Sequence, residues 1–190
     1  MHVPRSALAA RLALALLASL GGGCGKDPAR VAPPAPAPGT GAPAASPYAL
    51  AAEPKGSSPV TVLEAKAGGA KTAVAVVGRV REITPGFAAF TLTDVALTYC
   101  GQTEKEGCEN PWDYCCHDTA DIARHTVAVA VKTPAGDVVA APSLPELRNL
   151  DLVVVVGDLV KGADGEVMLV AKGWHRRERP TLPESVRFPP

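Results

Sequence analysis

A valine-rich stretch begins the folded part of this chain: residues 72–83 read TAVAVVGRVREI. Val74, Val76 and Val80 share one face of an extended strand, because successive side chains of a strand point to opposite sides. Gly78 interrupts the run, and a glycine inside a strand is typical of a bulge or a sharp coil. The stretch therefore predicts a long β-strand with one face toward a core.

Four more β-type runs follow. They cover residues 87–97, 125–132, 151–159 and 167–174. Pro85-Gly86 supplies the turn into the first of these, and Asp164-Gly165 is a strong hairpin signal before the last. The run LVVVV within 151–159 is typical of a strand buried on both faces. Thr61 and Glu64 have the spacing of a capping box and predict a short helix before the first strand.

A second capping-box signature, Ser143 with Glu146, predicts another short helix between the third and fourth strands. Five strands with one helix at that position form the OB-fold arrangement, a small Greek-key barrel. We therefore predict a mainly β domain: a five-stranded OB-fold-like Greek-key barrel with short helices and a cysteine-rich loop between strands 2 and 3. A different small β-barrel or sandwich is the alternative.

Three short segments are similar to those of OB-fold proteins of the anticodon-binding type. They are Val74 to Val80, Phe90 to Asp94 and Leu150 to Gly157. The capping box ahead of the first strand resembles the bacterial periplasmic OB-fold family. The resemblance covers residues 60–177 without the cysteine-rich insert, and it implies a binding module of unspecified ligand.

The first 23 residues have the layout of a signal peptide. Two arginines precede the apolar run of residues 12–20, which is too short to span a bilayer, and three glycines lead to Cys24. The junction resembles the bacterial lipobox, although Gly21 stands where the lipobox prefers leucine. The resemblance implies that Cys24 is lipidated; an ordinary secretory signal is the alternative. We expect an extracytoplasmic, bacterial membrane-anchored lipoprotein, on the periplasmic side or at the cell surface.

Composition divides the rest of the chain. Residues 24–58 contain the cysteine expected to be lipidated, followed by a stretch rich in proline and alanine. Proline lacks a backbone donor, so we expect this stretch to form an extended tether rather than a packed core. Residues 59–180 are the expected OB-fold-like domain, and residues 181–190 are a tail.

Four cysteines gather in the loop between the second and third strands. They are Cys100, Cys108, Cys115 and Cys116. A dense, even set in an exported domain favours disulfides. A bridge between neighbours is strained, so two connectivities remain: 100–115 with 108–116, or 100–116 with 108–115. Either pair of disulfides would add stability to a small core that consists largely of valine and alanine.

A metal site is the alternative for these cysteines. Four thiolates, or three with His117, suit zinc or cuprous copper. The sequence contains no CxxC knuckle and no CxxCH haem motif, and the oxidising compartment favours disulfides. We therefore expect no cofactor, with zinc or copper as the alternative. Trp112 and Tyr114 are expected to cover a disulfide pair rather than to form a recognition tip.

A basic and aromatic strip offers a third candidate. Its members are Phe87, Phe90, Lys172, Trp174, Arg176 and Arg177. In an OB-fold such a face binds oligonucleotides through stacking and cations. The alternative is a solvated chain end whose arginines pair with Glu178 and Glu184.

The charge balance and the motifs of the chain argue against two classes of function, nucleic-acid binding and catalysis. The chain has 19 basic and 19 acidic side chains and 4% aromatic residues, so it lacks the basic excess of sequence-independent phosphate binding. We expect no nucleic-acid partner. No nucleophile-elbow or zincin motif is present, so we expect no enzymatic activity. The sequence predicts a membrane-anchored, extracytoplasmic binding or interaction module for a protein or small ligand.

Overall fold

The computed structural model describes residues 45–56, 58–102, 108–141, 144–162, 164–182, 184 and 186, all within the second of two compact units, Gly41–Pro190. The predicted signal peptide, Cys24 and the first part of the tether lie outside the described residues. None of the described helices has the length and apolar character needed to cross a membrane.

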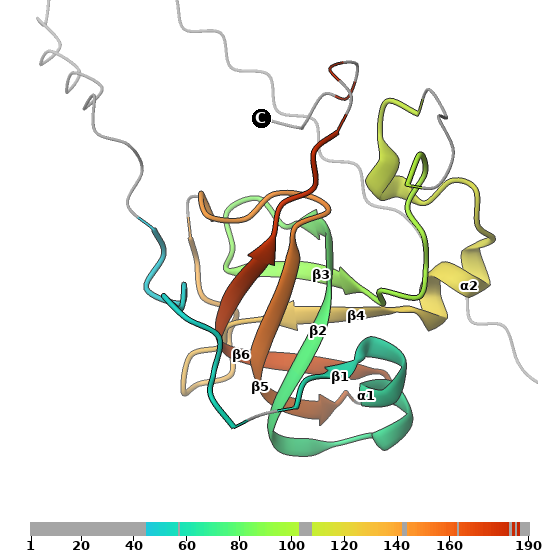
Figure 1. Ribbon diagram of the computed structural model, residues 1–190. Helices are drawn as coiled ribbons and strands as arrows, with labels where there is room; N and C mark the ends of the chain where they lie inside the picture. The colour runs from blue at the N-terminus through green and yellow to red at the C-terminus, as the bar shows by residue number, and fades with distance from the viewer. Residues whose placement is uncertain are drawn as a thin grey trace, which may run out of the picture. The chain divides into compact units, whose positions relative to one another are not determined.

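Six strands, two α-helices and one 3-10 helix make up the described part. They are β1 Val60–Thr61, α1 Val62–Gly68, β2 Lys71–Ile83, β3 Ala89–Thr93, η1 Pro111–Asp113, α2 Thr119–Arg124, β4 Thr126–Ala130, β5 Leu152–Lys161 and β6 Val167–Glu178. Figure 1 shows their arrangement.

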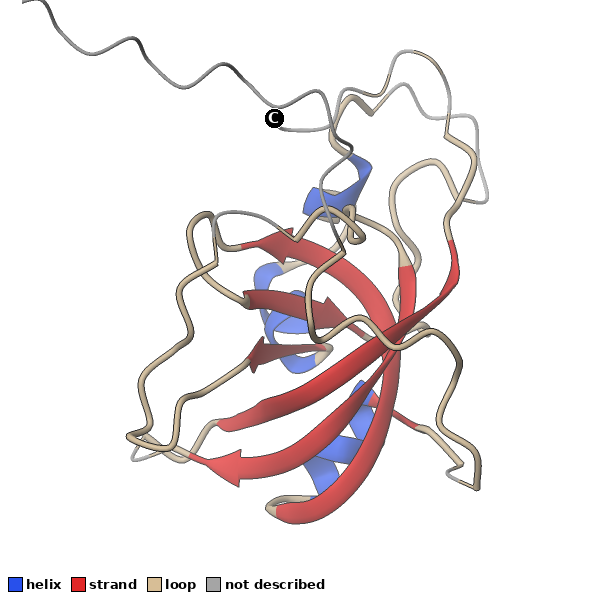
Figure 2. Ribbon diagram, turned by 90° about the vertical axis from the view of Figure 1, so that its left-hand side faces the viewer, coloured by secondary structure: helices blue, strands red, loops and turns tan. Residues whose placement is uncertain are grey.

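The five longer strands close into a barrel, which confirms the predicted OB-fold-like architecture. β2 pairs antiparallel with β3 and with β5, β3 with β4, and β5 with β6, while β4 and β6 pair parallel. Figure 2 shows the strands curling around to meet. The short β1 adds to β2 in parallel. The closed circuit leaves no long unpaired edge on these five strands.

Gly78 lies where β2 approaches the paired strand β3 closely. A Cβ atom there would lie 2.6 Å from Leu92 Cγ and 2.7 Å from the Thr93 carbonyl oxygen. No side chain fits at that distance, so only glycine allows the two strands to approach this closely. The bulge expected at Gly78 is not at this residue: Gly78 is in regular register with Val153, and the register of β2 shifts between Lys71 and Val74 and between Val80 and Glu82.

The barrel interior holds the main core. Val74, Val76 and Val80 of β2 are buried in it, as their alternation predicts. Val153 and Val155 of β5 face the same core, whereas Val154 is fully buried in a separate outer cluster with Ala75 and Val77. The LVVVV run is therefore buried on both faces, as expected.

The capping box at the start of α1 is formed. Thr61 Oγ1 accepts from Glu64 N at 3.2 Å, and the Glu64 carboxylate accepts from Thr61 N at 2.7 Å. Asp94, only 1% exposed, accepts from Leu63 N at 2.7 Å and from Ala96 N at 2.8 Å. This buried carboxylate ties α1 to the end of β3.

The helix predicted over residues 143–150 is absent from the described residues 144–150, which form turns. Their backbone bonds go elsewhere: Leu150 N donates to Val80 O at 2.6 Å, and Arg148 N donates to the Asp151 carboxylate at 2.9 Å. Bonds to β2 and to a buried side chain compete with the local helix.

The folded part begins before residue 59, where the sequence places its start. Trp174 N donates to Tyr48 O at 2.9 Å, and Leu50 N donates to Trp174 O at 2.8 Å. The rings of Tyr48 and Trp174 lie 5.7 Å apart. We name residues 45–56 the N-terminal strap. Backbone hydrogen bonds and the packing of Tyr48 on Trp174 thus hold the strap against β6.

Candidate functional site

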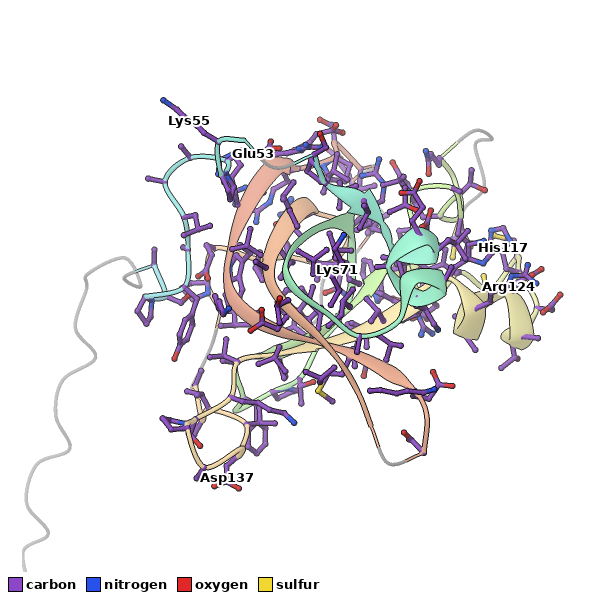
Figure 3. The ribbon with its side chains drawn as sticks, turned by 90° about the horizontal axis from the view of Figure 1, so that it is seen from below. Glu53, Lys55, Lys71, His117, Arg124 and Asp137 are labelled. Carbon is purple, nitrogen blue, oxygen red and sulfur yellow. The ribbon has the colours of Figure 1, made fainter. Side chains whose placement is uncertain are left out.

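The cysteine-rich segment between β3 and β4, residues 94–125, is the insert. It contains η1 and α2, and Figure 1 shows the described part beyond the ends of these two strands. Figure 3 shows His117 and Arg124 of the insert on a different side of the molecule from Glu53 and Lys55 of the strap. The cysteines therefore gather in a loop region, as the sequence predicts.

The insert packs on the barrel through a core of its own. Its buried members are Leu97, Trp112, Tyr114 and Leu150, of which only Leu150 comes from outside the insert. Tyr114 is fully buried and Trp112 is 7% exposed. Both rings thus pack inward, and neither forms an exposed tip.

Backbone strain concentrates in this second core. Tyr114 has φ 55° and ψ 35°, and Leu150 has φ 69°. Among the described residues other than glycine, only Ala73 also has a positive φ. The left-handed conformation costs a bulky residue about 1–2 kcal/mol, so the surrounding packing must hold it in place.

The Tyr114 side chain is also electrostatically unusual. Its buried hydroxyl makes no hydrogen bond of normal geometry among the described residues, and the nearby Thr93 side chain only partly opposes the effect of burial on its pKa. Burial raises the pKa of Tyr114 to about 12. The phenol therefore stays neutral at any physiological pH, and its hydroxyl lacks the well-formed hydrogen bond that buried polar groups normally have.

Two limbs of the insert run side by side. Cys100 N donates to Pro111 O at 3.4 Å, and the Nε2 atom of His117 lies 2.7 Å from Thr98 O. The left-handed turn at Tyr114, closed by His117 N donating to Tyr114 O at 2.9 Å, reverses the chain. This reversal returns the adjacent cysteines toward Cys100.

The four sulfurs form an uneven cluster. The Cys100 sulfur lies 2.7 Å from that of Cys116 and 3.4 Å from that of Cys115, and the sulfurs of Cys108 and Cys115 are 3.8 Å apart. No pair is at the bonding distance of about 2.05 Å. Cys100 is 3% exposed, Cys108 is half-buried, and the adjacent pair is exposed.

The thiols differ in acidity. Burial raises the pKa of Cys100, but hydrogen bonds from the side chain and the backbone of Cys116, and from the thiols of Cys115 and Cys108, outweigh it, so this pKa ends below its ordinary value. The hydrogen bond to Cys100, followed by that to Cys108, raises the pKa of Cys115 to about 12.

Three of the thiols are close enough to share a metal ion. The sulfurs of Cys100, Cys108 and Cys115 all lie within 4.8 Å of one another. His117, a candidate fourth ligand in the sequence, directs Nε2 to a backbone carbonyl and is not part of this group. The donor set is therefore three thiols rather than thiols with imidazole.

The aromatic members of the basic strip do not share an exposed face. Phe90 and Trp174 are 2% and 1% exposed and meet inside the barrel as an edge-to-face pair with centroids 5.4 Å apart. Phe87, in the turn before β3, is 45% exposed. The structure therefore does not bring the three rings together as a stacking surface.

The basic members of the strip have local partners. Lys172 pairs with Asp158 at 2.8 Å, and Arg177 Nε donates to the Glu53 carboxylate at 2.8 Å. Arg176 donates to Glu146 O at 2.8 Å. The arginines thus pair within the domain, but with groups other than the expected Glu178 and Glu184.

Sequence reasoning missed the polar contacts behind this strip. Arg179 reaches the fully buried carboxylate of Asp151 through two bonds of 2.7 and 2.6 Å. Glu146 accepts from Trp174 Nε1 at 3.0 Å and from Ser46 Oγ at 2.6 Å. No local pattern signals these pairs, because each joins distant parts of the chain.

Comparison with known proteins yields likenesses to solved structures. No family model matches the chain, and no curated protein matches it. A solved structure described as a putative aspartyl-tRNA synthetase from Leishmania major Friedlin superposes with a TM-score of 0.38 and 16% identity. The match covers 72% of this chain and 24% of that chain.

Proposed function

We propose that this protein is a membrane-anchored, extracytoplasmic binding module without enzymatic activity, and that the insert is its ligand-contacting element. The observation that carries the proposal is the strained second core. Tyr114 and Leu150 are both held in left-handed conformations where the insert meets the barrel. Strain of this kind persists only where surrounding structure enforces it, and it is enriched at functional sites.

The barrel face is a weaker candidate for the contact surface. Two of the three rings that would stack on an oligomer are inside the core, and the cations of β6 have acidic or backbone partners. The chain also has no net positive charge. These observations favour a protein or small ligand over a nucleic acid.

The buried carboxylates support a non-enzymatic role. Asp94 accepts two backbone N–H groups, and Asp151 accepts from Arg179 and from Arg148 N. Each stabilises a junction of the fold. Membrane anchoring rests on the sequence of the first 24 residues, with Cys24 as the acylated residue.

A thiolate metal site is the second candidate function. It rests on the three sulfurs of Cys100, Cys108 and Cys115 within 4.8 Å of one another. Zinc and cuprous copper are the ions that such soft donors select. Metal analysis of protein purified without chelator tests this candidate.

Site-specific photo-crosslinking tests the binding role. A benzophenone side chain is placed at Asp113 or Glu109, both exposed in the insert, in the full-length protein in its native envelope. Matched controls carry the probe at Ala128 on β4 and at Asp137, which Figure 3 shows at the tip of another loop.

Binding through the insert yields a discrete adduct from the two insert positions and none from the controls. Adducts from Ala128 alone would assign the contact to the barrel face. No adduct from any position would contradict the binding role.

A further inference from the structure

The spacing of the four sulfurs is uneven in a way that distinguishes bridges from a metal site. Four thiolates around one zinc at a Zn–S distance of about 2.3 Å stand about 3.8 Å apart. The pair Cys100 and Cys116 is much closer, at 2.7 Å. That distance suits two sulfurs about to bond rather than two thiolates that repel each other on a shared ion.

The register of the two limbs supports the same pair. His117 Nε2 lies against Thr98 O, and Cys100 N donates to Pro111 O, so contacts at Thr98 and at Cys100 itself hold the limbs together. Cys116, next to His117, has its sulfur 2.7 Å from that of Cys100. The Cys115 sulfur lies 3.4 Å from that of Cys100 and 3.8 Å from that of Cys108, so once Cys100 is bonded to Cys116 the remaining partner of Cys115 is Cys108.

We propose that Cys100–Cys116 and Cys108–Cys115 are the two disulfides of the exported protein, the first joining the two limbs of the insert and the second forming a solvent-accessible, reducible bridge at its rim. This inference rests on the proposed extracytoplasmic location. It chooses between the two connectivities that the sequence leaves open.

The chemistry requires an external oxidant. Formation of each bridge joins two sulfurs, releases two protons and transfers two electrons to the disulfide of a thiol–disulfide oxidoreductase, which becomes a dithiol. Reduction of the rim bridge by a small thiol reverses these steps through a mixed disulfide.

Burial separates the two bridges in reactivity. Cys100 is 3% exposed and Cys116 is exposed, so an attacking thiolate reaches the first bridge only at the Cys116 sulfur. Cys115 is exposed and Cys108 is half-buried, so a reductant can attack either sulfur of the second bridge. Accessible bridges are the ones that are labile or regulatory. The rim bridge is therefore the part of the insert that responds to redox conditions.

Partial reduction with cyanylation tests the pairing. Detergent-solubilised full-length protein from an oxidising compartment is reduced with limiting phosphine at acid pH, cyanylated, cleaved at alkaline pH and analysed by mass. The first-reduced species is expected to cleave before residues 108 and 115. Cleavage before 108 and 116, or before 100 and 115, would overturn the assignment. So would four titratable thiols with one zinc or copper per chain.

Paired variants separate the roles. C100S/C116S is expected to lower Tm by roughly 10 °C, because it opens the larger loop. The matched C108S/C115S is expected to lower Tm by a few degrees less, because closure entropy grows slowly with loop length, and to show no titratable thiol at the remaining pair. A larger Tm loss in C108S/C115S than in C100S/C116S would contradict the division of roles. Bridge mapping and Tm do not depend on ligand binding. If the bridges map as expected but the photo-crosslinking gives no adduct, the disulfide assignment stands and only the proposed binding role is rejected.

Discussion

The indole nitrogen of Trp174 donates to the carboxylate of Glu146 at 3.0 Å, and the same carboxylate accepts from Ser46 Oγ at 2.6 Å. One acidic side chain thus joins the largest ring of the barrel core to the N-terminal strap. Because Trp174 is 1% exposed, its N–H has no alternative partner in water. The contact connects the main core to a segment that the sequence places in a linker.

Glu146→Ala tests this contact. The substitution leaves Trp174 Nε1 buried and unpaired and releases Ser46, so we expect a loss of about 1–3 kcal/mol in the free energy of unfolding, measured by urea denaturation. Glu178→Ala, at an exposed position of β6, is the control and is expected to stay within about 0.5 kcal/mol of the parent. An equal loss in both variants would show that Glu146 has no special role.

Tyr114 allows a test of the second core. Tyr114→Phe keeps the ring and removes a buried hydroxyl that makes no hydrogen bond of normal geometry, so we expect unchanged or slightly higher stability. Tyr114→Ala removes the ring and is expected to cost about 3–5 kcal/mol. A large loss in the phenylalanine variant would reveal a hydrogen bond at the hydroxyl. Denaturant unfolding followed by tryptophan fluorescence measures both.

The raised pKa of Tyr114 predicts a pH effect of defined sign. The neutral phenol is favoured in the folded state, so its contribution is present below the ordinary tyrosine pKa of about 10 and is lost as pH rises toward about 12. Ultraviolet titration of the folded protein should show one late-ionising tyrosine that disappears in Tyr114→Phe. Titration of all tyrosines near pH 10 would contradict the burial.

The lowered pKa of Glu53 predicts a loss of stability as pH falls, opposite to the effect of Tyr114. The hydrogen bond from Arg177 holds the pKa of Glu53 below its ordinary value, so this contact stabilises the strap at neutral pH and is lost as pH falls through the lowered pKa. The protection factors of the amides of residues 45–56, which correct for the slower intrinsic exchange in acid, should fall as pH is lowered. Glu53→Gln should show low protection already at neutral pH and a flatter pH dependence of protection; an unchanged profile would argue against a role for the Glu53–Arg177 ion pair.

Gly78 is expected to tolerate no side chain. Gly78→Ala places a Cβ 2.7 Å from the Thr93 carbonyl oxygen, a backbone atom that cannot move aside easily, and should cost about 1–3 kcal/mol. Gly68→Ala, where no atom lies within 4 Å, is the matched control and should be neutral or stabilising. Similar changes in Tm for the two variants would contradict the close approach of β2 and β3 at Gly78.

Cys24→Ser tests the predicted anchor. The parent should fractionate with membranes and carry an acylated N-terminus by mass spectrometry, whereas the variant should lose the acyl group and become soluble. A membrane-bound, unacylated parent would show another mode of attachment.

The strands were predictable because their signal is local. Alternating valines in 72–83 and the LVVVV run report burial on one or both faces directly. The failed helix over 143–150 begins with Ser143-x-x-Glu146, the same capping-box spacing as the Thr61-x-x-Glu64 that correctly marks α1. What differs is tertiary: Leu150 and Asp151 bond to Val80 of β2, and that competition is invisible in a sequence window.

The cysteine cluster shows the same limit. The number of cysteines identifies the segment. Which sulfurs lie close to one another depends on the left-handed turn at Tyr114, and tyrosine rarely adopts this conformation. The strap was missed because Tyr48 and Leu50 are isolated apolar residues without a periodic pattern.

The strap also determines how the molecule responds to a mechanical load. If the protein is anchored as proposed, tension along the tether reaches the domain at residue 45 and acts first on the Ser46–Glu146 bonds, and then on the backbone bonds of Tyr48 and Leu50 with Trp174 and on the Glu53–Arg177 ion pair. Peeling these few contacts leaves the closed barrel intact and releases up to about 40 Å of extended chain. The strap therefore acts as a reserve of length that yields before the barrel strands separate.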